Sequence, residues 1–316
     1  MTLNPNVMID ASGVTIVTPR AEMGQGVHTT LAAMVAEGMD LDLGSVRVIH
    51  GPASAAYFNA AVLAEGVPFR LIDMGWLAET ARDAMGVPAK FLGIQITGGS
   101  STTIDGFDKM RLAGAAARAA LVQAAAERLG VAVDGLKTEG GAVVAPDGTR
   151  LLYTELAGEA AKVKLGSMPQ PKPRAEWRIL GKSQTRVDMV GKVTGTAIYT
   201  ADLRLPGMRF ATAKTNPNLG AGVNSYDATA DLAMPGLEKV VAIPGGVAVV
   251  ASSTWAAMLA AEAIVFDWAV ASYPADSAAI AKVLTDSFSA DRQDSRNRND
   301  GDVEAVLNGA VLNGAV

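Results

Sequence analysis

A proline-rich break near the middle divides the chain into two parts of different texture. Pro169, Pro171 and Pro173 alternate with polar residues, which favours an extended linker. Upstream, strands, glycine-rich loops and long helices follow one another, whereas the downstream part consists of short strands separated by turns. Both parts mix helices and strands, which predicts the α+β class. The predicted organisation is a module at 1–165, a linker at 166–176, a second domain at 177–273 and a linker-like tail at 274–316.

Hydrophobic periodicity predicts the individual elements. In the first part we expect strands at 7–10, 14–18 and 45–50 and helices at 27–39, 76–85, 104–129 and 154–162. In the second part we expect strands at 197–200, 209–215, 237–243, 246–251 and 264–268 and helices at 228–233 and 254–263. The uncharged stretch 240–261 is long enough to span a bilayer. Pro244, Gly245 and Gly246 interrupt it, however, which indicates strands and a turn rather than a membrane helix.

Composition excludes several classes of site. The 316 residues include no cysteine, so this chain holds no disulfide, thiolate zinc site or iron–sulfur cluster. His28 and His50 are the only histidines, too few for a three-histidine zinc site. The 27 basic and 32 acidic residues leave a net charge of −5, unlike the basic footprint of a nucleic-acid-binding protein. Residues 1–12 also lack the basic and apolar regions of a secretory signal.

The first candidate site is the loop Gly24-Gln25-Gly26, which lies between a predicted strand and a predicted helix. Glycine permits close approach of another group to the backbone, and the N–H groups of such a loop suit an anion or a carbonyl-like acceptor. Gln25 adds a donor and an acceptor that suit the edge of a heterocycle. His28 and Thr29 fall in the first helical turn, close to the loop. The alternative is a tight strand-to-helix turn with a surface glutamine.

The second candidate site is the small-residue loop at 98–103. Gly98 and Gly99 free the backbone, and the four hydroxyl residues from Ser100 to Thr103 lead into the long helix. Hydroxyls and N-terminal amides together suit phosphate. The alternative is a Ser/Thr capping cluster that needs no ligand. Two such loops in one module favour a shared phosphate-bearing ligand, although neither fits the G-x-G-x-x-G pattern of dinucleotide-binding folds or a Walker loop.

The remaining polar candidates have simpler interpretations. Glu22 is either a general base beside the first loop or a solvated loop residue. His50 ends an apolar strand and is expected to be a hydrogen-bonded structural residue. The charged residues near the start of the long helix are expected to form a solvated face with weak ion pairs; they are Asp105, Asp108, Lys109 and Arg111.

At these loops the chain resembles the molybdopterin-binding large subunit of the xanthine dehydrogenase/aldehyde oxidase family, in particular the branch of isoquinoline 1-oxidoreductase β-subunits. Glu-Met-Gly-Gln-Gly-Val-His-Thr at 22–29 is similar to that family's pterin-binding segment. Thr-Gly-Gly-Ser-Ser at 97–101 and the helix that follows are similar to its second cofactor loop. Gly-Lys-Val-Thr-Gly-Thr-Ala at 191–197 and Asp-Leu-Arg-Leu-Pro-Gly-Met at 202–208 resemble the opening of its α/β-hammerhead domain. The resemblance covers about residues 1–275.

The resemblance implies a molybdopterin-binding α+β module followed by an α/β-hammerhead domain. It implies a molybdenum hydroxylase that holds molybdopterin cytosine dinucleotide and transfers a water-derived oxygen to an electron-poor carbon of an N-heterocycle or aldehyde. A separate small iron–sulfur subunit is implied as partner, since this chain has no cysteine. The cofactor-binding residues it implies are Met23, Gly24, Gln25, Gly26, His28, Thr29, Gly98, Gly99, Ser100, Ser101 and Thr102. It assigns no metal ligand and no catalytic base to this chain.

The chain differs from members of the family in several respects, and these differences limit the function that we expect of it. Family members are more than twice this length, and their catalytic Gly-x-Gly-Glu segment and their Gly-Phe-Gly-Gly segment have no counterpart here. The twin-arginine signal of many relatives is absent, so we expect a cytoplasmic location, or a periplasmic one if an upstream signal is missing. We therefore expect part of a large subunit that is inactive alone. The alternatives are a non-catalytic module that docks a partner subunit, and an enzyme with another phosphate-bearing cofactor. The tandem Val-Leu-Asn-Gly-Ala at 306–315 indicates a truncation artefact or a helix end.

Overall fold

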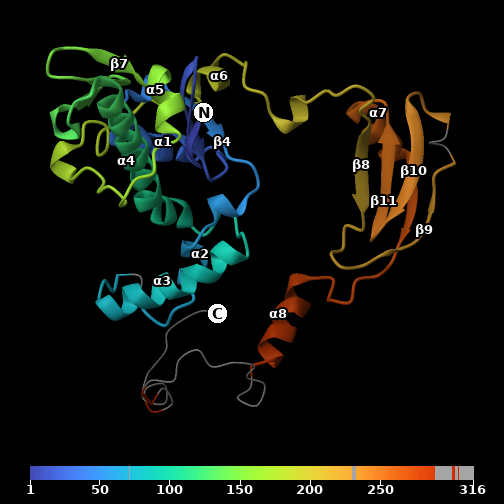
Figure 1. Ribbon diagram of the computed structural model, residues 1–316. Coiled ribbons are helices and arrows are strands. Elements are labelled where there is room, and N and C mark those ends of the chain that lie inside the picture. The colour runs from blue at the N-terminus through green and yellow to red at the C-terminus, as the bar shows by residue number, and fades with distance from the viewer. Residues whose placement is uncertain (71, 230–232, 289–300, 303–304, 306–316) are drawn as a thin grey trace. The chain divides into compact units, whose positions relative to one another are not determined.

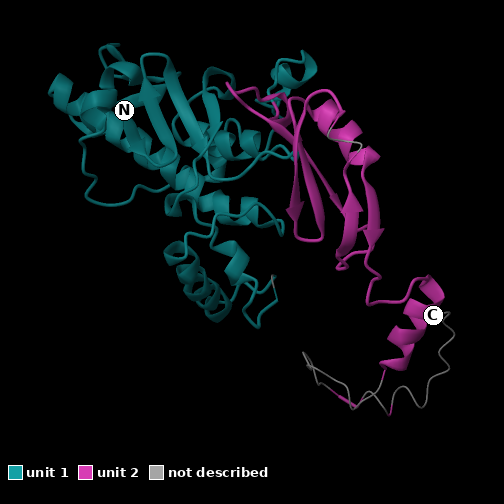
Figure 2. Cartoon of the chain, turned by 90° about the vertical axis from the view of Figure 1, so that its right-hand side faces the viewer, with its two compact units in different colours: residues 1–198 teal, residues 199–316 magenta. Residues whose placement is uncertain are grey.

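The computed structural model describes the chain except residues 71, 230–232, 289–300, 303–304 and 306–316. The chain forms two compact units, Met1–Ile198 and Tyr199–Val316 (Figure 2). The boundary lies later than the linker predicted at 166–176, because part of the following segment packs onto the first unit, where Ile179 joins the core. The tandem repeat at 306–315 lies outside the described residues.

The first unit contains a four-stranded sheet (Figure 1). Its strands, in spatial order, are β1 (Thr2–Asn4), β2 (Val7–Asp10), β3 (Gly13–Thr18) and β4 (Arg47–His50). Neighbours are antiparallel except β3 and β4, which run parallel. A parallel pair needs a crossover connection, and α1 (Val27–Gly38) provides it. This crossover places the loop at 19–26 at the carboxyl end of β3. The predicted strands and helix of this region are confirmed, with small differences at their ends.

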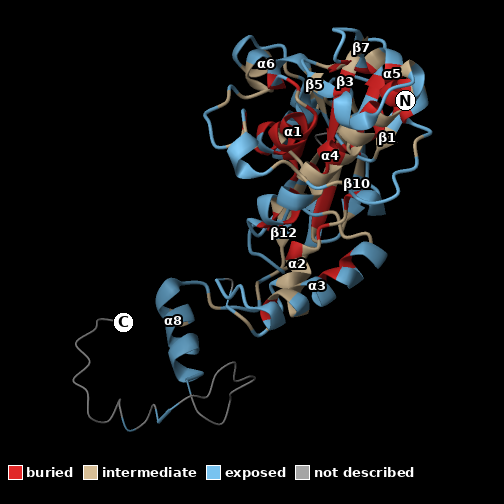
Figure 3. Ribbon diagram, turned by 60° about the vertical axis from the view of Figure 1, so that its left-hand side comes forward, coloured by how far each residue is buried: buried red, intermediate tan, exposed pale blue. Residues whose placement is uncertain are grey.

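The long helix α4 (Ser101–Leu129) packs against α1 and closes the core, as the buried residues of both helices show (Figure 3). Small residues permit the close approach: a Cβ on Gly114 would lie 2.7 Å from the carbonyl oxygen of Val35. Ile16, Leu31 and Leu121 are fully buried where sheet, α1 and α4 meet. Burial of each such side chain contributes about 1.5–3 kcal/mol, so this core holds α1 and α4 against the sheet.

Smaller elements complete the first unit. They are α2 (Ala61–Ala64), α3 (Trp76–Phe91), β5 (Lys137–Glu139), β6 (Ala142–Val144), β7 (Arg150–Leu152), α5 (Tyr153–Ala160) and α6 (Met189–Val193). The three strands form an antiparallel sheet in chain order. Helix α3 continues past its predicted end at residue 85, with Pro88 inside it.

The second unit is built on a three-stranded antiparallel sheet in the order β10 (Leu237–Ile243), β11 (Gly246–Ala251) and β8 (Phe210–Thr215). A Cβ on Gly246 would lie 1.9 Å from the carbonyl oxygen of Lys214 in β8, so the pairing of β11 with β8 requires glycine at this position. Helix α7 (Thr254–Ala263) covers the sheet. The small core consists of Val247, Val249, Ala260, Ala261 and Ile264.

Two further strands, β9 (Val223–Asp227) and β12 (Val265–Trp268), pair antiparallel, and α8 (Ser277–Asp286) buries none of its residues. The strands predicted at 237–243 and 246–251 and the helix at 254–263 are confirmed. The strand predicted at 197–200 is wrong, because this segment pairs with no strand among the described residues and leads into a short turn at 200–202. The helix predicted at 228–233 includes residues outside the described ones. No helix among the described residues is long and apolar enough to cross a membrane.

Candidate functional site

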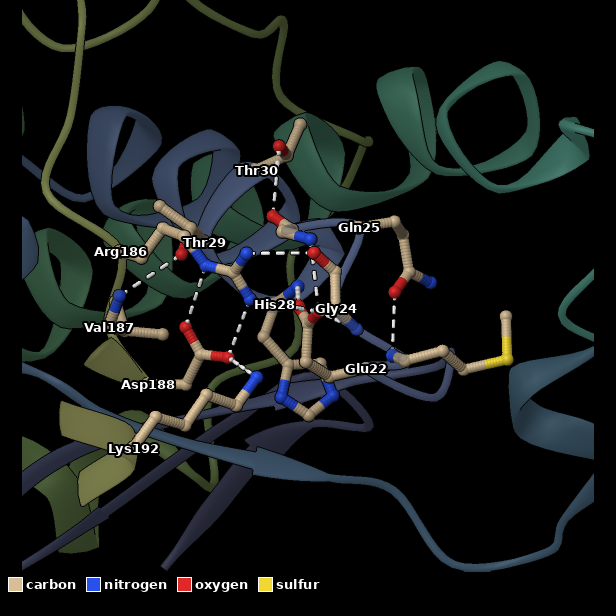
Figure 4. Close-up of polar contacts among 12 residues, drawn as sticks. Glu22, Gly24, Gln25, His28, Thr29, Thr30, Arg186, Val187, Asp188 and Lys192 are labelled. Carbon is tan, nitrogen blue, oxygen red and sulfur yellow. Dashed lines mark hydrogen bonds and ion pairs between the residues drawn. The ribbon is translucent and has the colours of Figure 1, made fainter. Parts of the chain in front are cut away.

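The first glycine loop is organised around the carboxylate of Glu22 (Figure 4). One oxygen accepts the backbone N–H groups of Gly24 at 2.8 Å and Gly26 at 2.9 Å, and the other accepts that of His28 at 3.1 Å. Both glycines are left-handed, with φ of 106° and 82°, which turns their amides inward. Glu22 therefore occupies the N-terminus of α1, where a negative charge is stabilising.

Glu22 was expected to be either a general base or a solvated loop residue, and the interpretation as a solvated residue is wrong. Its side chain is 8% exposed. Burial alone would raise the pKa of Glu22, but the three backbone hydrogen bonds outweigh it and hold the pKa below its ordinary value of 4.5. The loop amides that were expected to face a ligand anion are thus satisfied within the chain.

Gln25 is folded back onto its own loop. Its Oε1 accepts the N–H of Met23 at 2.6 Å, and its Nε2 donates to the carbonyl of Ala21 at 2.9 Å. Both Gln25 and Met23 stay exposed, so a ligand can reach them. Thr29 lies in the first turn of α1, as expected, and its hydroxyl accepts the N–H of Val187 at 3.1 Å.

The two histidines of the chain lie together. His28 donates from Nε2 to the carbonyl of Arg20 at 3.0 Å, and its ring stacks on that of His50 with 6.2 Å between centroids. Burial lowers the pKa of His28 below its ordinary value of 6.5. His50 is exposed, so its interpretation as a hydrogen-bonded structural residue is wrong; its side chain faces a cleft of about 270 Å³ that also touches Gln95 and Thr97.

We expect the first unit to lose stability as the pH falls through about 6.5. Because the folded pKa of His28 lies below its ordinary value, the unfolded chain takes up the proton more readily and acid favours unfolding. Glu22 acts in a lower window: its contribution is present above pH 4.5 and is lost as the pH falls through its folded pKa. Denaturant unfolding of the wild type and His28→Gln at about pH 7.5 and about pH 5.5 measures the first effect. An equal pH dependence in both proteins would contradict it.

The second glycine loop begins α4 in a different way from the first. Gly99 and Ser100 are both left-handed, with φ of 59° and 54°, and Ser100 makes no side-chain capping hydrogen bond. The first turn of α4 contains no acidic residue. Ser101 is fully buried: its hydroxyl donates to the carbonyl of Gly98 at 2.7 Å and accepts from Asn59 at 2.8 Å. The exposed part of the loop is therefore the backbone of 98–100, with the side chains of Ser100 and the half-buried Thr102 beside it.

Ser100 carries backbone strain that glycine would relieve. A non-glycine residue in the left-handed region costs about 1–2 kcal/mol, and φ of Ser100 is 54°. We expect Ser100→Gly to raise the free energy of unfolding by about 1 kcal/mol and Gly99→Ala to lower it by a similar amount. Denaturant melts of the two variants check this pair. A stabilised Gly99→Ala would mean that the loop has a different backbone conformation.

The two loops lie side by side. The backbone N–H of Ala21, just before the first loop, donates to Oγ1 of Thr97, just before the second, at 3.0 Å. A buried polar cluster underlies both. In it Arg20 pairs with Asp105 at 2.6 Å, Lys109 donates to the same carboxylate at 2.7 Å, and Asn59 holds Ser101. The expectation that Asp105 belongs to a solvated face is wrong, because its side chain is 2% exposed, whereas the Lys109 side chain is 38% exposed.

Sequence patterns missed this cluster because its partners are far apart in the chain. Asp108 fits the expected solvated face, since its side chain is 77% exposed. Sequence patterns also missed a contact of the first glycine loop. Arg186, from the segment after the proline-rich stretch, donates a hydrogen bond to the carbonyl oxygen of Gly24. Within the described ranges, no three His, Asp or Glu side chains gather closely enough to hold a metal ion.

The first unit is thus an α+β unit in which two glycine-rich loops lie next to each other, one closed on a carboxylate and one at a helix N-terminus without a side-chain cap. No protein-family model matches the chain. The chain is 32% identical over 303 residues to the β-subunit of isoquinoline 1-oxidoreductase from Brevundimonas diminuta, covering 84% of this chain and 35% of that protein.

Two other relatives match a similar share of the chain. A nicotinate dehydrogenase subunit of Pseudomonas putida is 28% identical over 78% of this chain and 19% of its own length. The membrane-bound aldehyde dehydrogenase (pyrroloquinoline-quinone) of Gluconacetobacter polyoxogenes is 27% identical over 81% of this chain and 30% of its own. The chain belongs to the xanthine dehydrogenase/aldehyde oxidase family of molybdopterin-binding subunits. It spans 35% or less of the length of these relatives.

Proposed function

We propose that the first unit binds part of the molybdopterin cytosine dinucleotide of a molybdenum hydroxylase. The observation that carries this proposal is the open N-terminus of α4, where Gly99 and Ser100 lead into a first turn without a cap or an acidic residue. Helix N-termini of this kind hold phosphate through their N–H groups. When bound, the cofactor supplies the redox chemistry: oxygen from water goes to an electron-poor carbon, and two electrons pass to molybdenum.

The two loops have different parts in this proposal. The amides of Gly24, Gly26 and His28 are already bound to Glu22, so the phosphate belongs at the second loop. The first loop then offers its exposed Gln25 side chain and remaining backbone groups to the pterin. Gly98, Gly99, Ser100 and Thr102 hold the phosphate, whereas Ser101 supports the turn from below.

One nearby group opposes an anion at the second loop. The Glu65 carboxylate lies close to Gly99, 3.8 Å from the position that a Cβ would occupy there. A like charge at that distance weakens phosphate binding unless the side chain turns away. Glu65→Gln is therefore expected to strengthen cofactor retention.

The activity of the whole protein extends beyond this chain. Relatives act on isoquinoline, nicotinate or aldehyde, as their names state, and we propose an N-heterocycle or an aldehyde as the substrate here. A small iron–sulfur subunit is proposed as partner, since the chain holds no cysteine for such a relay. The chain alone is expected to show no turnover, because it corresponds to about a third of the first relative.

A cofactor analysis with matched variants tests the proposal. The full chain is produced in a host that makes molybdopterin cytosine dinucleotide, and mass spectrometry identifies the bound pterin. Ser100→Asp places a negative charge where phosphate would bind, yet a carboxylate there favours the helix by about 0.3–1 kcal/mol. We expect about tenfold less pterin in Ser100→Asp than in Ser100→Gly, the loss of about 1.4 kcal/mol of binding, without a loss of fold. A wild type without pterin, equal retention in both variants, or bound pyrroloquinoline quinone instead would contradict the proposal.

The second candidate function is a non-catalytic module that docks a partner subunit. The observation that favours it is α8, which carries Ile280, Val283 and Leu284 on its surface and buries none of its residues. A stable complex with a partner subunit and no bound pterin would favour this function. Pterin in the purified chain would favour the first.

A further inference from the structure

The first glycine loop is held by a residue that lies far away in the sequence. Arg186 donates from one terminal nitrogen to the carbonyl oxygen of Gly24 at 2.8 Å and from the other to the carboxylate of Glu22 at 3.2 Å (Figure 4). These two acceptors are the backbone and the central anion of the loop. One guanidinium therefore contacts both parts of the structure that set the loop conformation.

Arg186 is itself fixed in place. Asp188 accepts from its Nε at 3.0 Å and from a terminal nitrogen at 2.7 Å, the two-point geometry that sets the plane of a guanidinium. Lys192, in α6, donates to the same carboxylate at 2.5 Å. The hydrogen bonds from Arg186, followed by that from Lys192, hold the pKa of Asp188 far below its ordinary value.

The segment that carries Arg186 is anchored to the helix after the loop. The N–H of Val187 donates to the hydroxyl of Thr29, in the first turn of α1. Between this segment and the loop lies a cleft of about 380 Å³, lined by Gln25, Gly26 and Thr30 on one side and by Lys182, Gln184 and Arg186 on the other. Arg186 and the loop therefore line the same cleft, and the contacts between them lie in its wall.

The peptide bond between Gly24 and Gln25 is planar and trans. In a trans peptide the C=O of one residue and the N–H of the next point in opposite directions. With the Gly24 carbonyl held toward Arg186, the N–H of Gln25 points away from Arg186. Among the described residues this N–H has no hydrogen-bond partner, whereas the amides of Met23, Gly24 and Gly26 are all bound. The contact with Arg186 therefore orients the one amide of residues 23–26 that a ligand can use.

We propose that Arg186 is a positioning residue for the loop at 22–26: by fixing the Gly24 carbonyl and the Glu22 carboxylate, it aims the Gln25 N–H at the ligand. The relevance to cofactor binding rests on the proposed function, whereas the positioning of the loop does not. The Arg186 side chain is part of the loop structure and does not act on the reacting atoms.

Hydrogen exchange of the loop amides in the full chain tests the positioning role. In Arg186→Met we expect the amides of Gly24, Gly26 and His28 to exchange about tenfold faster, as for the loss of one hydrogen bond to a charged group. Arg178→Met is the matched control, because its side chain belongs to the same segment but pairs with Asp40 instead of the loop. Exchange elsewhere in the first unit should change little in either variant.

The titration of His28 gives a second measurement. It would not change if Arg186 only stabilised the fold. The negative charge of Glu22 raises the pKa of His28, although burial dominates and lowers it. When Arg186 no longer holds the carboxylate, the His28 titration shifts, and only two histidine signals need to be followed.

Methylguanidinium is expected to restore slow loop exchange in Arg186→Ala. Unchanged loop exchange and titration in Arg186→Met, or faster exchange throughout the unit, would overturn the proposal.

The cofactor link is measured separately. Pterin retention of Arg186→Met is compared with that of Arg178→Met in chains produced with the cofactor. A loosened loop with reduced retention supports both proposals. A loosened loop with unchanged retention supports the positioning role and contradicts the part assigned to the first loop in the proposed function.

Discussion

Replacing Asp105 with alanine is expected to lower the free energy of unfolding of the first unit by about 3–5 kcal/mol, the cost of leaving a buried charge without its partner. The Arg20 side chain is 1% exposed and pairs with Asp105 at 2.6 Å, and burial already lowers the pKa of Arg20. Without the carboxylate, the guanidinium keeps only carbonyl acceptors, and Ala60 loses the acceptor of its N–H. Denaturant unfolding, followed by tryptophan fluorescence, measures the loss.

Asp108→Ala is the matched control for this prediction. It lies in the same first turns of α4, and its side chain is 77% exposed, so its loss should be within about 0.5 kcal/mol. Arg20→Met combined with Asp105→Leu should destabilise less than Asp105→Ala, because the double variant buries no unpaired charge. An Asp105→Ala protein as stable as Asp108→Ala would mean that the Arg20–Asp105 pair is not buried in solution.

Local patterns predicted the regular elements well because those elements are set by local chemistry. The apolar spacing of 27–39 produced α1, and the runs of β-branched residues on either side of Gly245 produced the β10–β11 hairpin. The prediction failed where an element depends on a distant partner. The segment 197–200 has strand-like composition, but no strand in the described part of the chain pairs with it.

The same distinction explains what was predicted of the site. The two glycine loops were found from composition, and the glycines at 24, 26 and 99 have the left-handed backbone that such turns require. The side chains that bind to these loops and to the residues beneath them were not predicted. Helical spacing places Asp105 and Asp108 near each other on α4, but it cannot show that Arg20, 85 positions earlier, is buried against one of them. Likewise, a carboxylate in a loop gives no sign that it caps the helix that follows.

The segment after the proline-rich stretch was predicted to begin the second domain, but it packs on the first unit. Here Glu37 of α1, buried and 2% exposed at its side chain, accepts three consecutive N–H groups, those of residues 178, 179 and 180. The carboxylate of Glu37 thus holds a turn of this segment on the first unit, upstream of Arg186.

Glu37→Ala is therefore expected to release this segment and to lower the free energy of unfolding by about 3 kcal/mol, since three N–H groups lose one acceptor and a buried donor without a partner costs about 1–3 kcal/mol. Glu37→Gln keeps an acceptor oxygen and should cost less than half as much. Glu139→Ala, whose side chain is exposed, is the control for loss of a carboxylate.

Limited trypsin digestion distinguishes release of the segment from general unfolding. Arg174 and Arg178 lie at its start, and cleavage after them should accelerate in Glu37→Ala under conditions in which α1 and α4 remain protected. Because Arg186 follows on the same segment, the loop amides of Gly24 and Gly26 should also exchange faster in this variant, with no substitution near the loop. Faster cleavage with unchanged loop exchange would show that the segment around residue 186 stays in place without Glu37, and that Thr29 and Glu22 are sufficient to hold it.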